Sequence, residues 1–214
     1  YVDLTEHMEH IISHWRSLGL TFSAIYSGFL GSSYQIDIVR EFIQSSKNEG
    51  QYVVIDPVMG DNGKPYGPIG TELIKKMKTY VQYADIITPN FTEAAFLLDK
   101  EYSRKTSEAT IKSWIYALAE KGPRMVIITS VPFQTEKEIS SVIAYDRDYG
   151  RFWKVNCSYI PAYYPGTGDI FTSVIVGSIL QGDSLPIALD RAVQFISIAI
   201  RSTFGHNFPR RDGV

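Results

Sequence analysis

Tyr164-Pro165-Gly166-Thr167-Gly168-Asp169 leads directly into an apolar run that spans residues 170–176. Glycines on both sides of Thr167 allow a tight turn, and the apolar run predicts that a helix begins there. The unpaired N–H groups at the start of a helix, together with the positive end of its dipole, attract anions. The backbone of Gly166, Thr167 and Gly168 is therefore a predicted anion site.

Asp169 falls in the first turn of this predicted helix. A carboxylate beside a bound anion suits a general base that takes the proton of a hydroxyl while that hydroxyl attacks a phosphoryl group. A structural interpretation is equally open at this point: Thr167 or Asp169 caps the helix and the glycines only make the turn. The rest of the chain has to decide between these two interpretations.

Size and composition favour one soluble domain. The chain has 214 residues, 44% of them hydrophobic, which suffices for one sizeable core. The net charge of −2 gives no global basic field to recruit nucleic acid or anionic lipid. Cys157 is the only cysteine, so no intrachain disulfide forms, and no apolar span of membrane-crossing length is present. We expect a cytoplasmic protein with neither nucleic-acid nor membrane partners.

Strand-like and helix-like patterns alternate along the chain. Short apolar runs predict buried strands at residues 21–29, 51–56, 85–88 and 124–130, and a hairpin formed by residues 139–145 and 151–157. Helical spacing of apolar residues predicts helices at 5–18, 33–48, 70–80, 90–98, 106–120, from the glycine turn onward, and at 184–204. This order predicts an α/β fold of three layers, α/β/α, with a mainly parallel central sheet.

Polar side chains follow three of the predicted strands. Asp56, Thr88 and Thr129 each lie at the C-terminal end of a strand, where ligands gather in open α/β sheets. We expect them to meet Asp169 along one edge. The Gly- and Pro-rich loop at residues 57–67 is too long and polar for a tight turn, and we expect it to act as a flap.

Phosphoryl transfer needs a phosphate cradle, a divalent metal with oxygen ligands and a proton acceptor. Asp56, Asp61 and Glu93 offer carboxylates for magnesium, held largely through water. Glu93 also has a structural interpretation, because Asn90 followed by Glu93 has the form of a capping box. Neither a P-loop nor a Gly-x-Gly-x-x-Gly motif after a strand is present, which excludes Walker-type and ordinary dinucleotide-binding enzymes.

Four motifs occur together in one order: Asp56-Pro-Val-Met-Gly-Asp61 with Gly63 and Tyr66, Thr88-Pro-Asn-Phe-Thr-Glu93, Thr129-Ser130, and Gly166-Thr-Gly-Asp169. In this order the chain resembles the pyridoxal kinases of the ribokinase-like superfamily. The resemblance runs from the first predicted helix to the last. It implies ATP-dependent phosphorylation of the 5′-hydroxymethyl group of pyridoxal, pyridoxine or pyridoxamine in vitamin B6 salvage.

The resemblance also implies roles for individual residues. Asp169 would be the base and would touch the substrate hydroxyl, and the backbone of Gly166, Thr167 and Gly168 would hold the γ-phosphoryl. The implied nucleotide-binding residues are Asp56, Asn90, Glu93, Thr129, Ser130, Thr167 and Gly168. The implied metal site comprises Asp61 and Glu93 for Mg²⁺, and Asp56 with Thr88 for a monovalent cation (K⁺ or Na⁺) or a phosphate-bound water. The loop at 59–66 would close over ATP, and a homodimer is expected.

One departure concerns the start of the chain. In the family that the sequence resembles, the first strand–helix–strand unit supplies residues that grip the pyridine ring, and these positions would precede Tyr1. We therefore expect residues 1–214 to form a single ribokinase-like domain that lacks this segment.

Two other functions remain open. Hydroxymethylpyrimidine kinases share the scaffold but usually carry Cys where Asp169 stands and Gly-Gly-His after the strand that here ends in Thr129-Ser130. Both differences favour pyridoxal kinase, although a dual-specificity enzyme remains possible. The alternative of another class is a catalytically weak vitamin- or nucleotide-binding protein that kept the fold.

Overall fold

A six-stranded sheet forms the centre of the molecule. The computed structural model describes residues 2–133, 139–160, 162–206 and 213. The strand order is β1-β2-β5-β6-β7-β8, in which the first four strands are parallel and β7 and β8 form an antiparallel hairpin. The strands are β1 (Ala24–Ser27), β2 (Tyr52–Ile55), β5 (Ile86–Ile87), β6 (Met125–Val131), β7 (Ile139–Asp146) and β8 (Arg151–Ser158).

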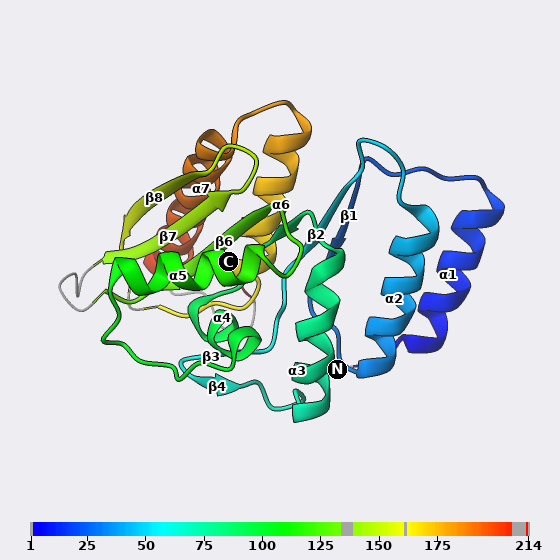
Figure 1. Cartoon of the computed structure of the whole chain (residues 1–214), viewed down its shortest axis with the longest axis horizontal. Coiled ribbons are helices and arrows are strands. Elements are labelled where there is room, and N and C mark those ends of the chain that lie inside the picture. The colour runs from blue at the N-terminus through cyan, green and yellow to red at the C-terminus, as the bar shows by residue number, and fades with distance from the viewer. Residues whose placement is uncertain (1, 134–138, 161, 207–212, 214) are drawn as a thin grey trace.

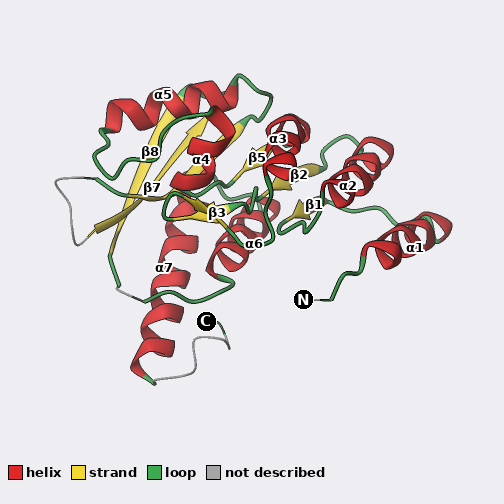
Figure 2. Ribbon diagram, turned by 90° about the horizontal axis from the view of Figure 1, so that it is seen from below, coloured by secondary structure: helices red, strands yellow, loops and turns green. Residues whose placement is uncertain are grey.

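Helices cover both faces of this sheet. Figures 1 and 2 show α2 to α5 on one face and α6 and α7 on the other, with α1 beside α2 beyond the β1 edge, so the three-layer α/β/α prediction is confirmed. The helices are α1 (Thr5–Ser17), α2 (Ser33–Ser46), α3 (Thr71–Tyr80), α4 (Phe91–Leu98), α5 (Glu108–Ala119), α6 (Thr167–Leu180) and α7 (Leu185–Gly205), with a 3₁₀ turn η1 (Val81–Tyr83) after α3.

The apolar runs of the strands are continuous because both faces of the sheet are buried. In β2, the side chains of Val53 and Ile55 belong to the core under α1 to α5, whereas Val54 belongs to the core under α6 and α7. All three have no exposed surface. One strand thus contributes to two separate cores, which ties the layers together.

Two expectations about local structure need correction. The strand predicted at 21–29 is only four residues long, β1, because residues 21–23 and 28–29 are not part of the paired strand. The loop at 57–67 does contain a tight turn: β3 (Gly60–Asp61) pairs with β4 (Lys64–Pro65), and Asn62 and Gly63 both have positive φ. An Asn-Gly pair in this conformation is typical of a two-residue hairpin turn, a signal that outweighs the length and polarity of the loop.

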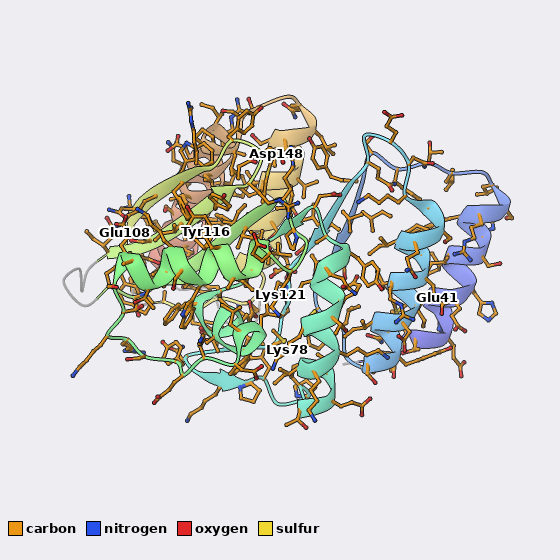
Figure 3. The ribbon with its side chains drawn as sticks, in the orientation of Figure 1. Glu41, Lys78, Glu108, Tyr116, Lys121 and Asp148 are labelled. Atoms are coloured by element: carbon orange, nitrogen blue, oxygen red, sulfur yellow. The ribbon has the colours of Figure 1, made fainter. Side chains whose placement is uncertain are left out.

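Polar side chains lie on the outer surfaces of the helices. Figure 3 shows Glu108 and Tyr116 on α5 and Lys78 on α3. Lys78 forms an ion pair with Asp99 just beyond α4, and the Tyr116 ring packs edge-on against Tyr145 of β7 at 5.0 Å between centroids. None of the helices in the described part of the chain combines the length and hydrophobicity needed to cross a membrane.

Candidate active site

The C-terminal ends of the four parallel strands lie on one edge of the sheet, and a cleft of about 1160 Å³ opens there. Every site residue predicted from the sequence lines this cleft. They are Asp56, Asp61, Thr88, Asn90, Glu93, Thr129, Ser130, Gly166, Thr167, Gly168 and Asp169. The structure therefore brings together residues that are more than a hundred positions apart in the chain.

The glycine turn begins α6 as the sequence predicts. Gly166 is the N-cap and has φ +88°, a left-handed conformation that favours glycine. Among the described residues no side chain caps this helix, and the Thr167 hydroxyl instead donates to the carbonyl oxygen of Tyr164 at 3.3 Å. The structural interpretation, in which the side chain of Thr167 or Asp169 caps the helix, is therefore wrong. The first N–H groups of α6 are left to face a ligand.

Asp169 reaches from the first turn of α6 to the end of β1. The Tyr26 hydroxyl donates to Asp169 Oδ1 at 3.1 Å. Gly28 lies beneath this contact, because a Cβ at that position would come within 3.1 Å of Asp169 Oδ1 and 3.3 Å of the Tyr26 hydroxyl oxygen. Burial, followed by the charges of Asp56 and Asp169, raises the pKa of Tyr26, so its hydroxyl remains a proton donor.

Asp56 lies directly after β2 and is 5% exposed. Burial, and then the charge of Asp169, raise the pKa of Asp56 to about 7, while hydrogen bonds from Thr88 and Tyr26 oppose the rise. The Thr88 hydroxyl also pairs with that of Thr172 at 2.9 Å. Two carboxyl groups thus share the site in different environments, because Asp56 is buried whereas Asp169 is exposed in the first turn of α6.

Glu93 is buried at the start of α4 and accepts from the backbone. Its carboxylate receives the Met59 N–H at 3.0 Å and the Asn90 N–H at 2.8 Å, and the Asn90 side chain accepts the Glu93 N–H in return. The capping box predicted as the structural alternative is therefore present. Burial, and then the Asp56 charge, raise the pKa of Glu93 well above its usual range. Asn90 Nδ2 also donates to the Gly60 carbonyl oxygen at 2.8 Å, so the cap holds the β3–β4 hairpin.

The β3–β4 hairpin covers one side of the cleft. Tyr66, just beyond the hairpin, forms a side-chain hydrogen bond with Tyr163 on the segment that precedes the glycine turn. Burial, followed by this interaction, raises the pKa of Tyr66. Arg104 Nη2 donates to Asn62 Oδ1 at 3.0 Å. These contacts join the predicted flap to both neighbouring walls.

Thr129 and Ser130 lie in an irregular part of β6. The register between β6 and β7 shifts between Ile128 and Val131, and Ser130 has φ +54°. A non-glycine residue in this region of φ is uncommon and costs energy, and such positions cluster at functional sites. The bulge turns both hydroxyl-bearing residues to the lining of the cleft.

The carboxylates do not form a direct metal cage. No group of three or more His, Cys, Asp or Glu side chains in the described parts of the chain is arranged to hold a metal ion. The Asp61 carboxylate accepts both the backbone and the side-chain N–H of Asn62, and Glu93 is engaged by backbone donors. This arrangement fits magnesium, which keeps several waters and binds through one or two carboxylates and substrate phosphates.

Sequence reasoning missed Tyr26, Gly28 and Arg104. The rule that selected Asp56, Thr88 and Thr129, namely position at the end of a parallel strand, also applies to the end of β1, so Tyr26 and Gly28 had a usable signal. Arg104 and Lys105 line the cleft from the loop before α5. No local pattern marks these two cations, because only the tertiary fold brings that loop to the site.

A sequence model of the family described as phosphomethylpyrimidine kinase matches residues 8–210. The chain is 32% identical over 191 residues to the pyridoxal kinase of Arabidopsis thaliana, covering 86% of this chain and 60% of that protein. It is 29% identical over 197 residues to the pyridoxal kinase of Dictyostelium discoideum, covering 87% of this chain and 63% of the relative. The chain thus spans about 60% of the length of these relatives.

Solved structures give the same fold. A candidate phosphomethylpyrimidine kinase from Bacteroides thetaiotaomicron, crystallised with pyridoxal, superposes with a TM-score of 0.95 at 50% identity and covers all of this chain and 74% of its own. The pyridoxal kinase of Lactobacillus plantarum superposes with a TM-score of 0.87 at 28% identity, with coverage of 100% and 74%.

Proposed function

Because the chain belongs to the phosphomethylpyrimidine kinase family, within the ribokinase-like fold, we propose that it transfers the γ-phosphoryl of ATP to the 5′-hydroxymethyl group of a B6 vitamer. The relatives named pyridoxal kinase and the pyridoxal complex of a related protein support this acceptor. The acceptor is pyridoxal, pyridoxine or pyridoxamine.

The single observation that carries the proposal is the position of Asp169 at the start of α6. Its carboxylate lies one residue beyond Gly168, beside backbone N–H groups that no side chain in the described chain caps. An anion hole and a proton acceptor are thus adjacent, as transfer of a phosphoryl group to a hydroxyl requires. A protein that only binds its ligand has no need of this pairing.

In the proposed reaction Asp169 accepts the proton of the acceptor hydroxyl. The hydroxyl oxygen forms the new bond to the γ-phosphorus, the bond from that phosphorus to the β–γ bridging oxygen breaks, and ADP leaves with the electron pair. The N–H groups of Thr167 and Gly168 stabilise the oxygens of the transferring group. Covering of the cleft by the β3–β4 hairpin and Tyr66 excludes water, which would otherwise compete with the acceptor.

ATP lies in the proposed complex along the end of β6. Its phosphates would contact Thr129, Ser130 and Asn90. Its adenine would lie against the apolar wall of the cleft that includes Val193 and Ile196 of α7. Mg²⁺ would be held by Asp61 and Glu93 through water, and a monovalent cation by Asp56 and Thr88. When bound, these ions supply positive charge that neutralises the phosphates.

The remaining proposals concern the whole protein. We propose that the chain works as a single domain, as a homodimer and in the cytoplasm. Sedimentation of the purified protein tests the dimer, because a monomeric mass at micromolar concentration would contradict it.

A second candidate function is phosphorylation of hydroxymethylpyrimidine or its phosphate. The description of the matching family favours it. Asp169 and Thr129-Ser130 depart from the pattern of those kinases, so we place this activity second, either alone or as part of a dual specificity.

We predict that Asp169→Asn lowers kcat by roughly 100-fold or more, because it removes the base while keeping the shape of the side chain. ADP formation is measured with ATP and Mg²⁺ and with pyridoxal, pyridoxine, pyridoxamine, hydroxymethylpyrimidine or no acceptor. Asp190→Asn, at an exposed carboxylate of α7, is the matched control and should turn over normally. Normal turnover by Asp169→Asn would contradict the mechanism, and wild-type protein that binds the vitamer but forms no ADP would favour the binding-protein alternative.

A further inference from the structure

Tyr26 is the one tyrosine whose hydroxyl contacts the proposed base in the described structure. It is the third residue of β1, between Ile25 and Ser27. Because successive side chains of a strand point to opposite faces, Ile25 enters the core under α1 to α5, whereas Tyr26 packs into the core under α6 and α7. Helix α6 packs against β1 on that face, which brings Tyr26 and Asp169 together.

The end of β1 restrains one particular oxygen of Asp169. The Tyr26 hydroxyl donates to Oδ1, and the space over Gly28 is filled by that same oxygen and the same hydroxyl. The terminal torsion of an aspartate is broad, so a carboxylate with no such partner samples many orientations. Here the Tyr26 hydroxyl donates to Oδ1, and the absence of a Cβ at Gly28 leaves room for Oδ1 in this position. Together they restrict this torsion of Asp169.

We propose that Tyr26 is a positioning residue for the proposed base: its hydroxyl holds Asp169 Oδ1 over Gly28, so that Oδ2 faces the acceptor hydroxyl. This inference rests on the proposed function and adds to it the strand that orients the base. The Tyr26 hydroxyl also interacts with the Asp56 carboxyl, but it has a single proton, which in this structure is donated to Asp169 Oδ1. Donation of this proton to Oδ1 orients the Asp169 carboxylate.

Tyr26→Phe keeps the ring in the core and removes only the hydroxyl. We expect kcat to fall by about 10-fold, because a misplaced base loses near-attack geometry, while KM for ATP stays within about 2-fold. Tyr52→Phe is the matched control: Tyr52 is a half-buried tyrosine of the neighbouring strand that packs into the same core, at the opposite end of the strand from the cleft. Its turnover should equal that of the wild type.

A double-mutant cycle separates positioning from a structural role. If Tyr26 acts through Asp169, Tyr26→Phe added to Asp169→Asn costs less than about 2-fold in residual kcat, because the group it orients is gone. An equal loss in both backgrounds, or an unchanged kcat of the single variant, would overturn the inference. Wild-type protein without acceptor-dependent turnover would overturn the proposed function and the inference with it.

Gly28→Ala tests the other side of the same oxygen without removing a hydrogen-bonding group. The added methyl would lie 3.1 Å from Asp169 Oδ1, so we expect kcat to fall while the melting temperature changes by no more than a few degrees. A kcat equal to that of the wild type in a folded Gly28→Ala variant would show that this space does not orient the base.

Discussion

At the scale of single residues, the site contains two buried carboxyl groups whose ionisation lowers the stability of the folded state. Asp56 and Glu93 are 5% and 3% exposed, and burial is the main cause of the raised pKa of both. Binding sites often carry this kind of cost, because charges placed for a ligand are poorly solvated before the ligand arrives.

The pH dependence of stability follows from the direction of the Asp56 shift. Its pKa rises from 3.8 to about 7 on folding, so the folded state binds more protons than the unfolded state between these values. The stabilisation is fully present below about pH 4 and is lost as the pH rises through 7. We expect Asp56→Asn to remove this loss, which is on the order of 4 kcal/mol at about 1.4 kcal/mol per pKa unit.

Thermal denaturation of both proteins from pH 4 to pH 8 measures the difference. Asp56→Asn should melt above the wild type at pH 8, and the gap should close toward pH 4. The exposed-site control Asp190→Asn should follow the wild-type curve at every pH. A lower melting temperature for Asp56→Asn at pH 8 would show that the carboxylate is stabilised rather than strained by its surroundings.

At the scale of elements, the conformation of the β3–β4 hairpin depends on particular residues of its own sequence. Asn62 and Gly63 form the turn, and the Gly63 N–H donates to the Thr92 hydroxyl at 3.0 Å. Gly60 pairs closely with β4, since a Cβ there would lie 2.2 Å from the Lys64 carbonyl oxygen. The hairpin is thereby fixed to the start of α4, where it presents Asp61 to the cleft.

We predict that Gly63→Ala disturbs the hairpin more than the same change at another turn. Residue 63 has φ +76°, and a Cβ added there would lie 2.8 Å from the Tyr102 ring. Residue 150 also has a positive φ, +61°, but a Cβ added there would meet no other atom within 4 Å. Gly150→Ala should cost about 1 kcal/mol for the backbone conformation alone, and Gly63→Ala about 1–3 kcal/mol more for the clash.

Denaturant unfolding compares the two variants, and steady-state kinetics tests the function of the hairpin. KM for ATP should rise several-fold in Gly63→Ala and stay unchanged in Gly150→Ala. Equal stabilities, or an unchanged KM for ATP in Gly63→Ala, would contradict a hairpin that closes over the nucleotide.

At the scale of the whole molecule, the cleft is lined by segments from both ends of the chain. Its walls include Phe29 beyond β1 and Ile200 of α7, and both cores reach it. A ligand that touches all of these segments must stabilise the folded state as a whole, because it binds the native protein and not the unfolded chain.

We expect Mg²⁺-ADP at 100 times its Kd to raise the melting temperature by about 5–10 °C, from about 2.7 kcal/mol of linkage at about 2–4 °C per kcal/mol. Asp169→Asn should keep this shift, because Asp169 serves the acceptor. Thr129→Val, which removes a hydroxyl at the end of β6, should reduce it. Differential scanning fluorimetry measures all three proteins, and a Thr129→Val shift equal to that of the wild type would place the nucleotide elsewhere.

The layers and most of the residues that line the cleft could be predicted from the amino-acid sequence. Apolar residues with a period of 3.6 identify the helices, and short apolar runs identify the parallel strands. Both patterns are visible in the sequence because a buried face of an element requires apolar residues at regular positions. The rule that ligands gather at strand ends then selects Asp56, Thr88 and Thr129, and the glycine turn selects Asp169.

The hydrogen-bond partner of each of these groups, in contrast, depends on the folded chain. Tyr26 reaches Asp169 across 143 positions of the sequence, and Arg104 reaches Asn62 across 42. The β6 bulge and the left-handed Ser130 likewise depend on the pairing of β6 with β7. Local sequence encodes conformation through propensity and periodicity, whereas the orientation of a buried side chain depends on neighbours that only the folded chain supplies.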